Sequence, residues 1–244
     1  MRSKKTAAAS WTAHLRQRLR DGGSPAVARS IQRFFIEPVR CYGWKTAELR
    51  RFARRTQREI FVEGGFSLLL AVADRLFSGK ANDEKNLAVL LLENRIKHFG
   101  DAEFRRFEGW LSRITNWSEH DALVHYLIGP LMASDRRRVA RAFAWARSKD
   151  PWHRRAAAVS LIQATRRRLY FREITRLSGR LLSDQNEMVR KGLGWLLRET
   201  AKADPARTVP YLLRIRLRAP RLVLRTACET LPTGTRRRII GRAR

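Results

Sequence analysis

Residues 150–159 read DPWHRRAAAV, and two later segments follow a related pattern, QNEMVRKGLG at 185–194 and PRLVLRTACE at 220–229. Each segment runs from an Asp- or Pro-marked turn into a helical pattern. Aligned in this way, Arg155, Arg190 and Arg225 recur at a spacing of 35 residues, and Trp117 and Trp152 are separated by the same interval. A repeat of this length is typical of stacked helix pairs.

Helical periodicity dominates the rest of the chain. Apolar residues follow the i, i+3, i+4, i+7 spacing over residues 48–61, 87–99, 104–114 and 155–169, and long alternating strand patterns are absent. Short breaks separate these segments, and several place Asp or Ser before a Pro that opens the next helix. We therefore predict an all-α fold, an α-solenoid of about six HEAT-like helical pairs with a basic concave cleft. We assign a basic tail to residues 1–12 and one solenoid domain to residues 13–244.

The charge of the chain predicts its partner. Lys and Arg number 52 against 22 Asp and Glu, which gives a formal net charge of +30. Such a surface repels itself, so we expect an anionic polymer as the partner. Of the 52 cations 43 are arginines, which favours forked contacts to phosphate, although nucleotide bias in the genome explains the excess equally well.

If the recurring arginines Arg155, Arg190 and Arg225 lie on the concave side of the solenoid, they form a basic track for a duplex. The alternative, which we favour for Arg190 and Arg225, is that they cap or bridge neighbouring repeats.

Several other classes are excluded by composition. Two cysteines cannot make a disulfide scaffold, and no apolar run approaches the roughly 20 residues that span a bilayer. The five histidines lack metal-ligand spacing, and Gly-rich phosphate loops and the GxSxG elbow of hydrolases are missing. We expect a cytoplasmic protein, nucleoid-associated in a bacterium, with no metal and no cofactor.

Residues 114–121, ITNWSEHD, contain the strongest candidate site. Trp117 and Asp121 are four residues apart and share a face of a helix. An aromatic face beside a carboxylate attracts a cation, and a carboxylate is costly on a surface that binds phosphate. On spacing alone, a core Trp117 with Asp121 paired to an arginine remains the favoured alternative. A scheme in which Glu119 supplies a second carboxylate is also open.

Three segments together resemble the AlkD family of DNA alkylation repair glycosylases, which are HEAT-like solenoids. They are DPWHRRAAAVSLI at 150–162, VRKGLGWLLRETAK at 189–202 and Asn116-Trp117 with Asp121. Phe34-Phe35, Tyr42-Gly43 and Leu49-Arg50 resemble the opening repeat of that family, so the likeness covers roughly residues 25–230. The sequence departs from the common family pattern at Ser118, where an Asp usually follows the tryptophan.

The resemblance implies roles for individual residues. Asp121 corresponds to the catalytic carboxylate, and Trp117 and Trp195 correspond to the two tryptophans of the cleft. Arg155 corresponds to the arginine near the lesion phosphate, although the adjacent Arg154 is an equal candidate. We add Arg190 and Trp152 to the predicted DNA-binding residues. The alternative for Trp152 is that its side chain only packs against and stabilises the turn at the start of its own helix.

A plausible chemistry follows from these residue types. An N3- or N7-alkylated purine is cationic and leaves without protonation, so a carboxylate needs only to stabilise the oxocarbenium-like sugar and orient water. We therefore predict a monomeric, monofunctional DNA glycosylase that removes 3-methyladenine or 7-methylguanine from duplex DNA and leaves an abasic site. The main alternative is a non-catalytic HEAT-repeat protein that binds bent or branched DNA. A scaffold for RNA or acidic proteins is the third class, because charge alone does not separate these partners.

Overall fold

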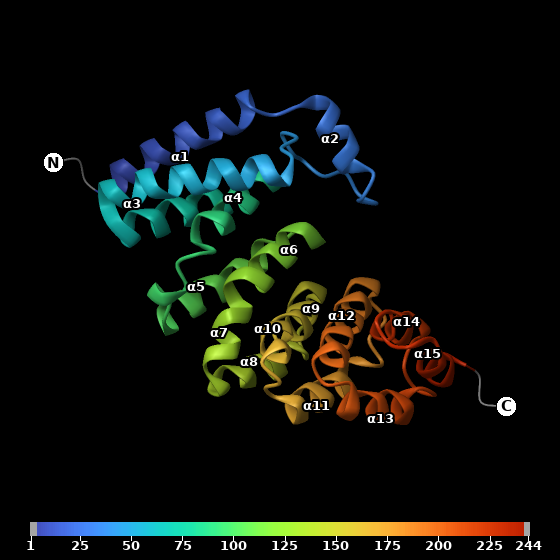
Figure 1. Ribbon diagram of the computed structural model, residues 1–244. Coiled ribbons are helices and arrows are strands. Elements are labelled where there is room, and N and C mark those ends of the chain that lie inside the picture. The colour runs from blue at the N-terminus through green and yellow to red at the C-terminus, as the bar shows by residue number, and fades with distance from the viewer. Residues whose placement is uncertain (1–3, 242–244) are drawn as a thin grey trace. The chain divides into compact units, whose positions relative to one another are not determined.

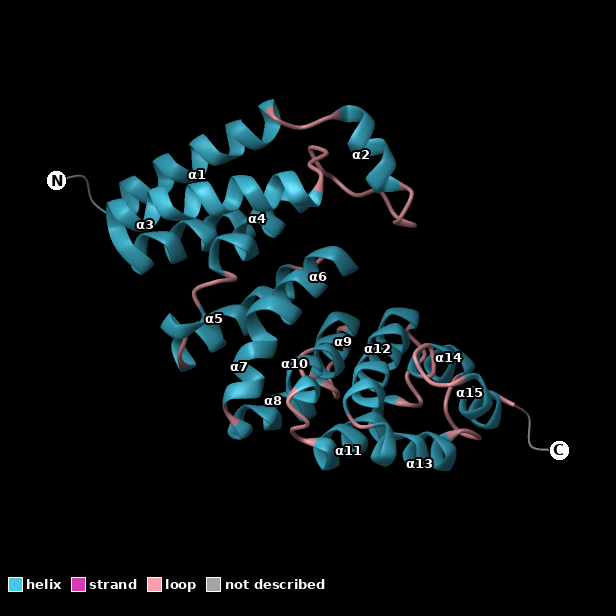
Figure 2. Ribbon diagram, in the orientation of Figure 1, coloured by secondary structure: helices cyan, strands magenta, loops and turns pink. Residues whose placement is uncertain are grey.

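The computed structural model describes residues 4–241, and Figure 2 shows them as helices joined by loops and turns. The helical content is 76%, and the described residues contain no strand. The predicted all-α helical repeat fold is thereby confirmed. The chain divides into two compact units, Met1–Leu127 and Ile128–Arg244.

The first unit is built around a long kinked helix (Figure 1). In α3 (Thr46–Phe77) Gly64 and Gly65 leave the helical conformation, and Gly65 takes a φ of +65°, a region that favours glycine. The helix is therefore kinked at this pair. Helices α1 and α4 pack against α3. The remaining helices of this unit are α1 (Lys4–Asp21), α2 (Pro25–Gln32), α4 (Asn82–Leu92), η1 (Ile96–His98), α5 (Asp101–Trp110), η2 (Leu111–Arg113) and α6 (Trp117–Leu123).

The predicted boundary at residue 12 lies inside α1. Residues 4–12, which we assigned to a basic tail, form the first half of that helix, and Ala8 and Thr12 are buried. Residues 1–3 of the same assignment lie outside the described part of the chain.

The second unit is centred on α12 (Glu187–Ala203), which packs between α9 and α14. Two glycines allow this close approach. A Cβ atom on Gly192 would lie 3.0 Å from Cγ of Arg155 on α9, and one on Gly194 would lie 2.8 Å from Cβ of Thr226 on α14. The other helices are α7 (Gly129–Ser134), η4 (Arg136–Arg138), α8 (Val139–Trp145), α9 (Pro151–Val159), α10 (Ile162–Arg166), α11 (Phe171–Leu181), α13 (Pro205–Ile215), α14 (Arg221–Ala227) and α15 (Thr233–Ile240). A π-helical segment, η3 (Val124–Ile128), contains the point of division between the units.

The predicted helix starts are confirmed where Pro follows an Asp or Ser. Helices α2, α9 and α13 begin at Pro25, Pro151 and Pro205. In each case the preceding Ser24, Asp150 or Asp204 side chain accepts a backbone N–H of the first turn.

Two predicted helices are interrupted. The segment 87–99 forms α4 only as far as Leu92, and 155–169 breaks after Val159 before α10 begins at Ile162. No helix within the described residues is long and apolar enough to cross a membrane.

Candidate functional site

Helix α6 is anchored to α4 by a buried ion pair. Nζ of Lys85 lies 2.8 Å from Oε2 of Glu119, and the two side chains are only 4% and 1% exposed. Lys85 also donates to the carbonyl of Arg113, and Thr115 donates its backbone N–H to Glu119. Because these buried contacts occupy its carboxylate, Glu119 holds α6 in place and is poorly suited to touch a substrate.

The start of α6 is fixed by Asn116. Its side-chain oxygen accepts the backbone N–H groups of Ser118 and Glu119 at 3.0 and 3.1 Å. This cap satisfies donors that a helix N-terminus otherwise leaves unpaired. Trp117 is therefore the first residue of the helix, and Asp121 follows one turn later.

Asp121 is held by a buried histidine. Nδ1 of His120 lies 2.7 Å from Oδ1 of Asp121; the imidazole is fully buried, while the carboxylate side chain is 22% exposed. With Nδ1 protonated, the ring donates to the carboxylate and fixes its direction. Asp121 thus combines a fixed position with an exposed portion, as a group that stabilises a cation requires.

Trp117 is stacked on an aromatic ring from another segment. The ring centroids of Trp117 and Phe35 are 5.0 Å apart and the planes differ by 16°. Phe35 covers one face of the indole, so only the opposite face can contact a nucleotide. The stack also joins the segment after α2 to the helix that contains Asp121.

The other predicted site residues belong to the second unit. Trp152 is the second residue of α9, where Asp150 accepts its backbone N–H at 2.8 Å, and Trp195 lies on α12. Both tryptophans are half-buried.

The predicted DNA-binding arginines of α9 and α12 contact the first turn of α12 or the turn before it. Arg154 forms an ion pair with Asp184 at 2.6 Å, and Nε of Arg190 donates to the carbonyl of the same residue at 2.6 Å. Arg155 is 5% exposed and donates to the carbonyl of Met188 at 2.5 Å. The contacts of Arg154 and Arg155 join α9 to α12 and the turn before it, whereas Arg190 bonds to the turn that precedes its own helix, the capping arrangement that the sequence analysis offered for it. A role in DNA binding stays a prediction for all three arginines.

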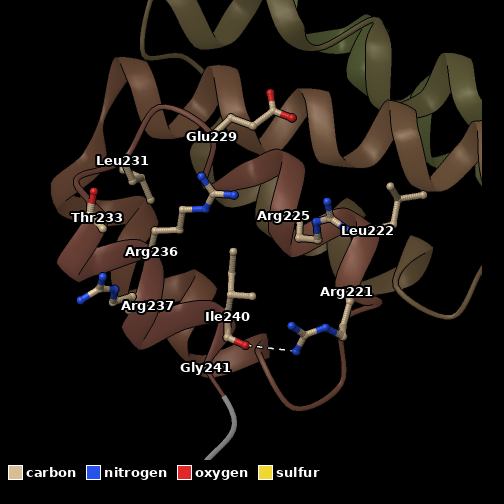
Figure 3. Close-up of a pocket in the computed structure, with 10 residues that line it drawn as sticks. All are labelled: Arg221, Leu222, Arg225, Glu229, Leu231, Thr233, Arg236, Arg237, Ile240 and Gly241. Atoms are coloured by element: carbon tan, nitrogen blue, oxygen red, sulfur yellow. Dashed lines mark hydrogen bonds between the residues drawn. The ribbon is translucent and has the colours of Figure 1, made fainter.

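Arg225, the third recurring arginine, has a different environment. It is exposed and lines a pocket of about 1040 Å³ between α14 and α15, together with Arg221, Arg236 and Arg237 (Figure 3). Arg221 donates to the carbonyl of Ile240 at 3.2 Å. The one carboxylate among the lining residues, Glu229, is paired with Arg198. The pocket is therefore strongly basic.

A buried thiol lies close to this pocket. Burial raises the pKa of Cys228 to about 11, although the charge of Arg236 acts in the opposite direction. Within residues 4–241, no group of three His, Cys, Asp or Glu side chains is placed to hold a metal ion.

Sequence reasoning missed two partners in the site. His120 was considered only as a metal ligand, and Phe35 only as part of a motif in the opening repeat. A local signal existed for His120, since it adjoins Asp121. None existed for Phe35, because its partner Trp117 is 82 positions away.

Comparisons with known proteins agree with this architecture. The sequence profile of the family described as DNA alkylation repair enzyme matches residues 15–231. A solved structure described as a predicted DNA alkylation repair enzyme from Enterococcus faecalis superposes with a TM-score of 0.76 at 16% sequence identity. The match covers 86% of this chain and 97% of that one, and it shows a shared fold. No curated protein matches the chain significantly. Because the family profile spans most of its length, the chain belongs to the DNA alkylation repair enzyme family.

Proposed function

We propose that the protein is a monofunctional DNA glycosylase that hydrolyses the N-glycosidic bond of cationic N3- or N7-alkylated purines in duplex DNA. The observation behind this proposal is the geometry of Asp121. The carboxylate is partly exposed, fixed by buried His120, and shares its helix face with Trp117. Membership of a DNA alkylation repair family supplies the substrate class.

The proposed reaction uses the charge already present on the lesion. The C1′–N bond breaks and its electron pair neutralises the purine, so no proton need be donated to the base. Asp121 stabilises the positive charge that develops on the sugar and orients the attacking water, whose proton passes to the carboxylate or to solvent. The face of Trp117 opposite Phe35 adds a cation–π contribution of about 0.5–2 kcal/mol.

The lysine that contacts this helix is unsuited to covalent catalysis. The Nζ of Lys85 is buried, paired with Glu119 and bonded to the carbonyl of Arg113. A lysine that forms a Schiff base must be neutral and reach the sugar. This supports hydrolysis that leaves an abasic site, without strand cleavage.

The test is base release from a duplex with a single 7-methylguanine. We expect the wild-type protein to free the base, and the strand to break only after alkali treatment. Direct strand cleavage would contradict a monofunctional enzyme. Tight binding with no release of either 7-methylguanine or 3-methyladenine would overturn the enzyme and favour a protein that only binds DNA.

A further inference from the structure

The segment after α2 presents two apolar side chains to solvent. Phe34 is 72% exposed and Ile36 is 95% exposed, whereas Phe35 between them turns inward onto Trp117. Each exposed apolar side chain forgoes the free energy that burial would contribute. The pair is therefore a candidate contact surface, and Phe35 between its two members ties it to the helix that contains Asp121.

This segment is held in place from within. Gln32, the last residue of α2, donates to the carbonyls of Phe35 and Glu37 at 3.3 and 3.0 Å and accepts the N–H of Val39 at 2.8 Å. One side chain thus bridges the turn that presents Phe34 and Ile36. A surface fixed in this way loses little conformational entropy when it binds.

Helix α4 holds the other end of the segment. Asn82 donates its backbone N–H to the carbonyl of Arg40 at 2.8 Å. Asp83 accepts the N–H groups of Tyr42 and Trp44 at 2.6 and 3.2 Å. Burial raises the pKa of Asp83 even though these hydrogen bonds act to lower it. The apolar pair therefore lies on a segment braced at both ends.

The surroundings of the pair are basic. Arg29, Arg33 and Arg40 are exposed, and Glu37 is the single carboxylate between residues 29 and 40, so this stretch has a net charge of +2. Two apolar side chains flanked by arginines are complementary to a base step flanked by phosphates. The arginines can pair with the phosphates, and the apolar side chains can be buried between the bases. The arginines around the apolar pair would disfavour a purely apolar protein partner.

We propose that Phe34 and Ile36 form a wedge that inserts between stacked base pairs of duplex DNA, next to the nucleotide on which Asp121 acts. The stack of Phe35 on Trp117 couples the wedge to the catalytic helix. Insertion unstacks a base step and exposes the sugar of the lesion without requiring an enclosed base pocket. The cost of insertion is least where stacking is already weak, so the wedge favours damaged or mismatched steps. The inference rests on the proposed function in that DNA is the substrate.

The experiment uses an unmodified duplex that contains 2-aminopurine, whose fluorescence rises when it is unstacked. We expect the wild-type protein to brighten a probe beside a mismatch, and the double variant Phe34→Ser, Ile36→Ser to lose this rise. Val62→Ser is the matched control, because Val62 is also apolar, 88% exposed and in the same unit. Phe34→Leu should retain the rise, since leucine also serves as a wedge in minor-groove binders. Affinity for the mismatched duplex should fall about tenfold in the double variant, the scale of losing one base-stacking contact.

The outcomes separate the wedge from the glycosylase. A rise that persists in the double variant, or is lost equally in Val62→Ser, overturns the wedge, provided that circular dichroism shows all variants folded. A wedge-dependent rise without base release from alkylated DNA would support the wedge and overturn the glycosylase. If the wild-type protein releases alkylated bases but leaves 2-aminopurine stacked, the glycosylase is supported and the wedge is overturned.

Discussion

At the scale of single residues, two carboxylates on one short helix have opposite environments. Glu119 is buried and paired with Lys85, whereas Asp121 is partly exposed and braced by His120. Burying a charge is tolerated only when it is paired, so Glu119 contributes to stability. Asp121 retains contact with solvent, so we assign it to the chemistry. The two residues should therefore respond differently to the loss of their charge.

Glu119→Gln should destabilise the protein by about 3–5 kcal/mol, because it leaves the Lys85 ammonium buried without its counter-charge. Urea unfolding measures this loss. The control is Glu187→Gln, which removes an exposed pair with Lys191 that solvent screens, so its effect on stability should be far smaller. Equal effects of the two substitutions would show that the buried pair does not anchor α6.

The sequence predicted only part of the site, because it reveals local relations between residues and not contacts between distant segments. Helical spacing placed Trp117 and Asp121 on one face, because that relation is local. The pairing of Lys85 with Glu119 and the stack of Phe35 on Trp117 join distant segments, which periodicity does not reveal. Spacing alone also favoured a core Trp117 and an arginine-paired Asp121; Trp117 is half-buried, and Asp121 has His120 as one of its partners.

At the scale of elements, helix starts were more predictable than helix continuity. Asp or Ser followed by Pro marks the first turn by local hydrogen bonding, and α2, α9 and α13 begin there. The break after Val159 was missed because Leu161 and Ile162 are both fully buried, so the apolar pattern runs on through the interruption. Burial pattern reports which residues face the core, and it does not report whether the backbone remains helical.

The packing of α12 against α14 depends on Gly194. Gly194→Ala would place Cβ 2.8 Å from Cβ of Thr226, and this strain of about 1–3 kcal/mol exceeds the gain of about 1 kcal/mol in helix propensity. We expect a lower melting temperature in calorimetry.

Gly179→Ala is the matched control for that substitution. Gly179 lies in α11, is exposed, and has nothing within 4 Å of an added Cβ. At this position no clash offsets the gain in helix propensity, so the variant should be more stable than wild type by up to about 1 kcal/mol. Stabilisation by both alanines would contradict close packing at Gly194.

At the scale of the whole molecule, the net charge of +30 governs encounter with DNA. Its cations are not equivalent, because Arg154, Arg155 and Arg190 already have partners in the protein, whereas Arg225 lines the basic pocket. Charge counting from sequence predicts an anionic partner. It does not separate arginines that bridge helices from those that face solvent, since that distinction depends on which carbonyls and carboxylates the fold brings near.

Arg225→Gln should reduce the dependence of duplex binding on salt. If its guanidinium contacts one phosphate, the slope of log K against log salt falls by about 0.9. Arg136→Gln removes the same charge from an exposed arginine that is paired with Glu173, and it should leave the slope nearly unchanged. Identical slopes for wild type and Arg225→Gln would place the DNA away from the α14–α15 pocket.

In the proposed function, Asp121 stabilises the transition state of base release. The most direct test is single-turnover release of 7-methylguanine from a defined duplex by wild type and Asp121→Asn. We predict release by wild type and a rate at least about tenfold lower in the variant, equivalent to about 1.4 kcal/mol or more in the barrier, with duplex binding retained. A variant that binds the duplex and releases the base at the wild-type rate would contradict the assignment of Asp121 as the catalytic carboxylate.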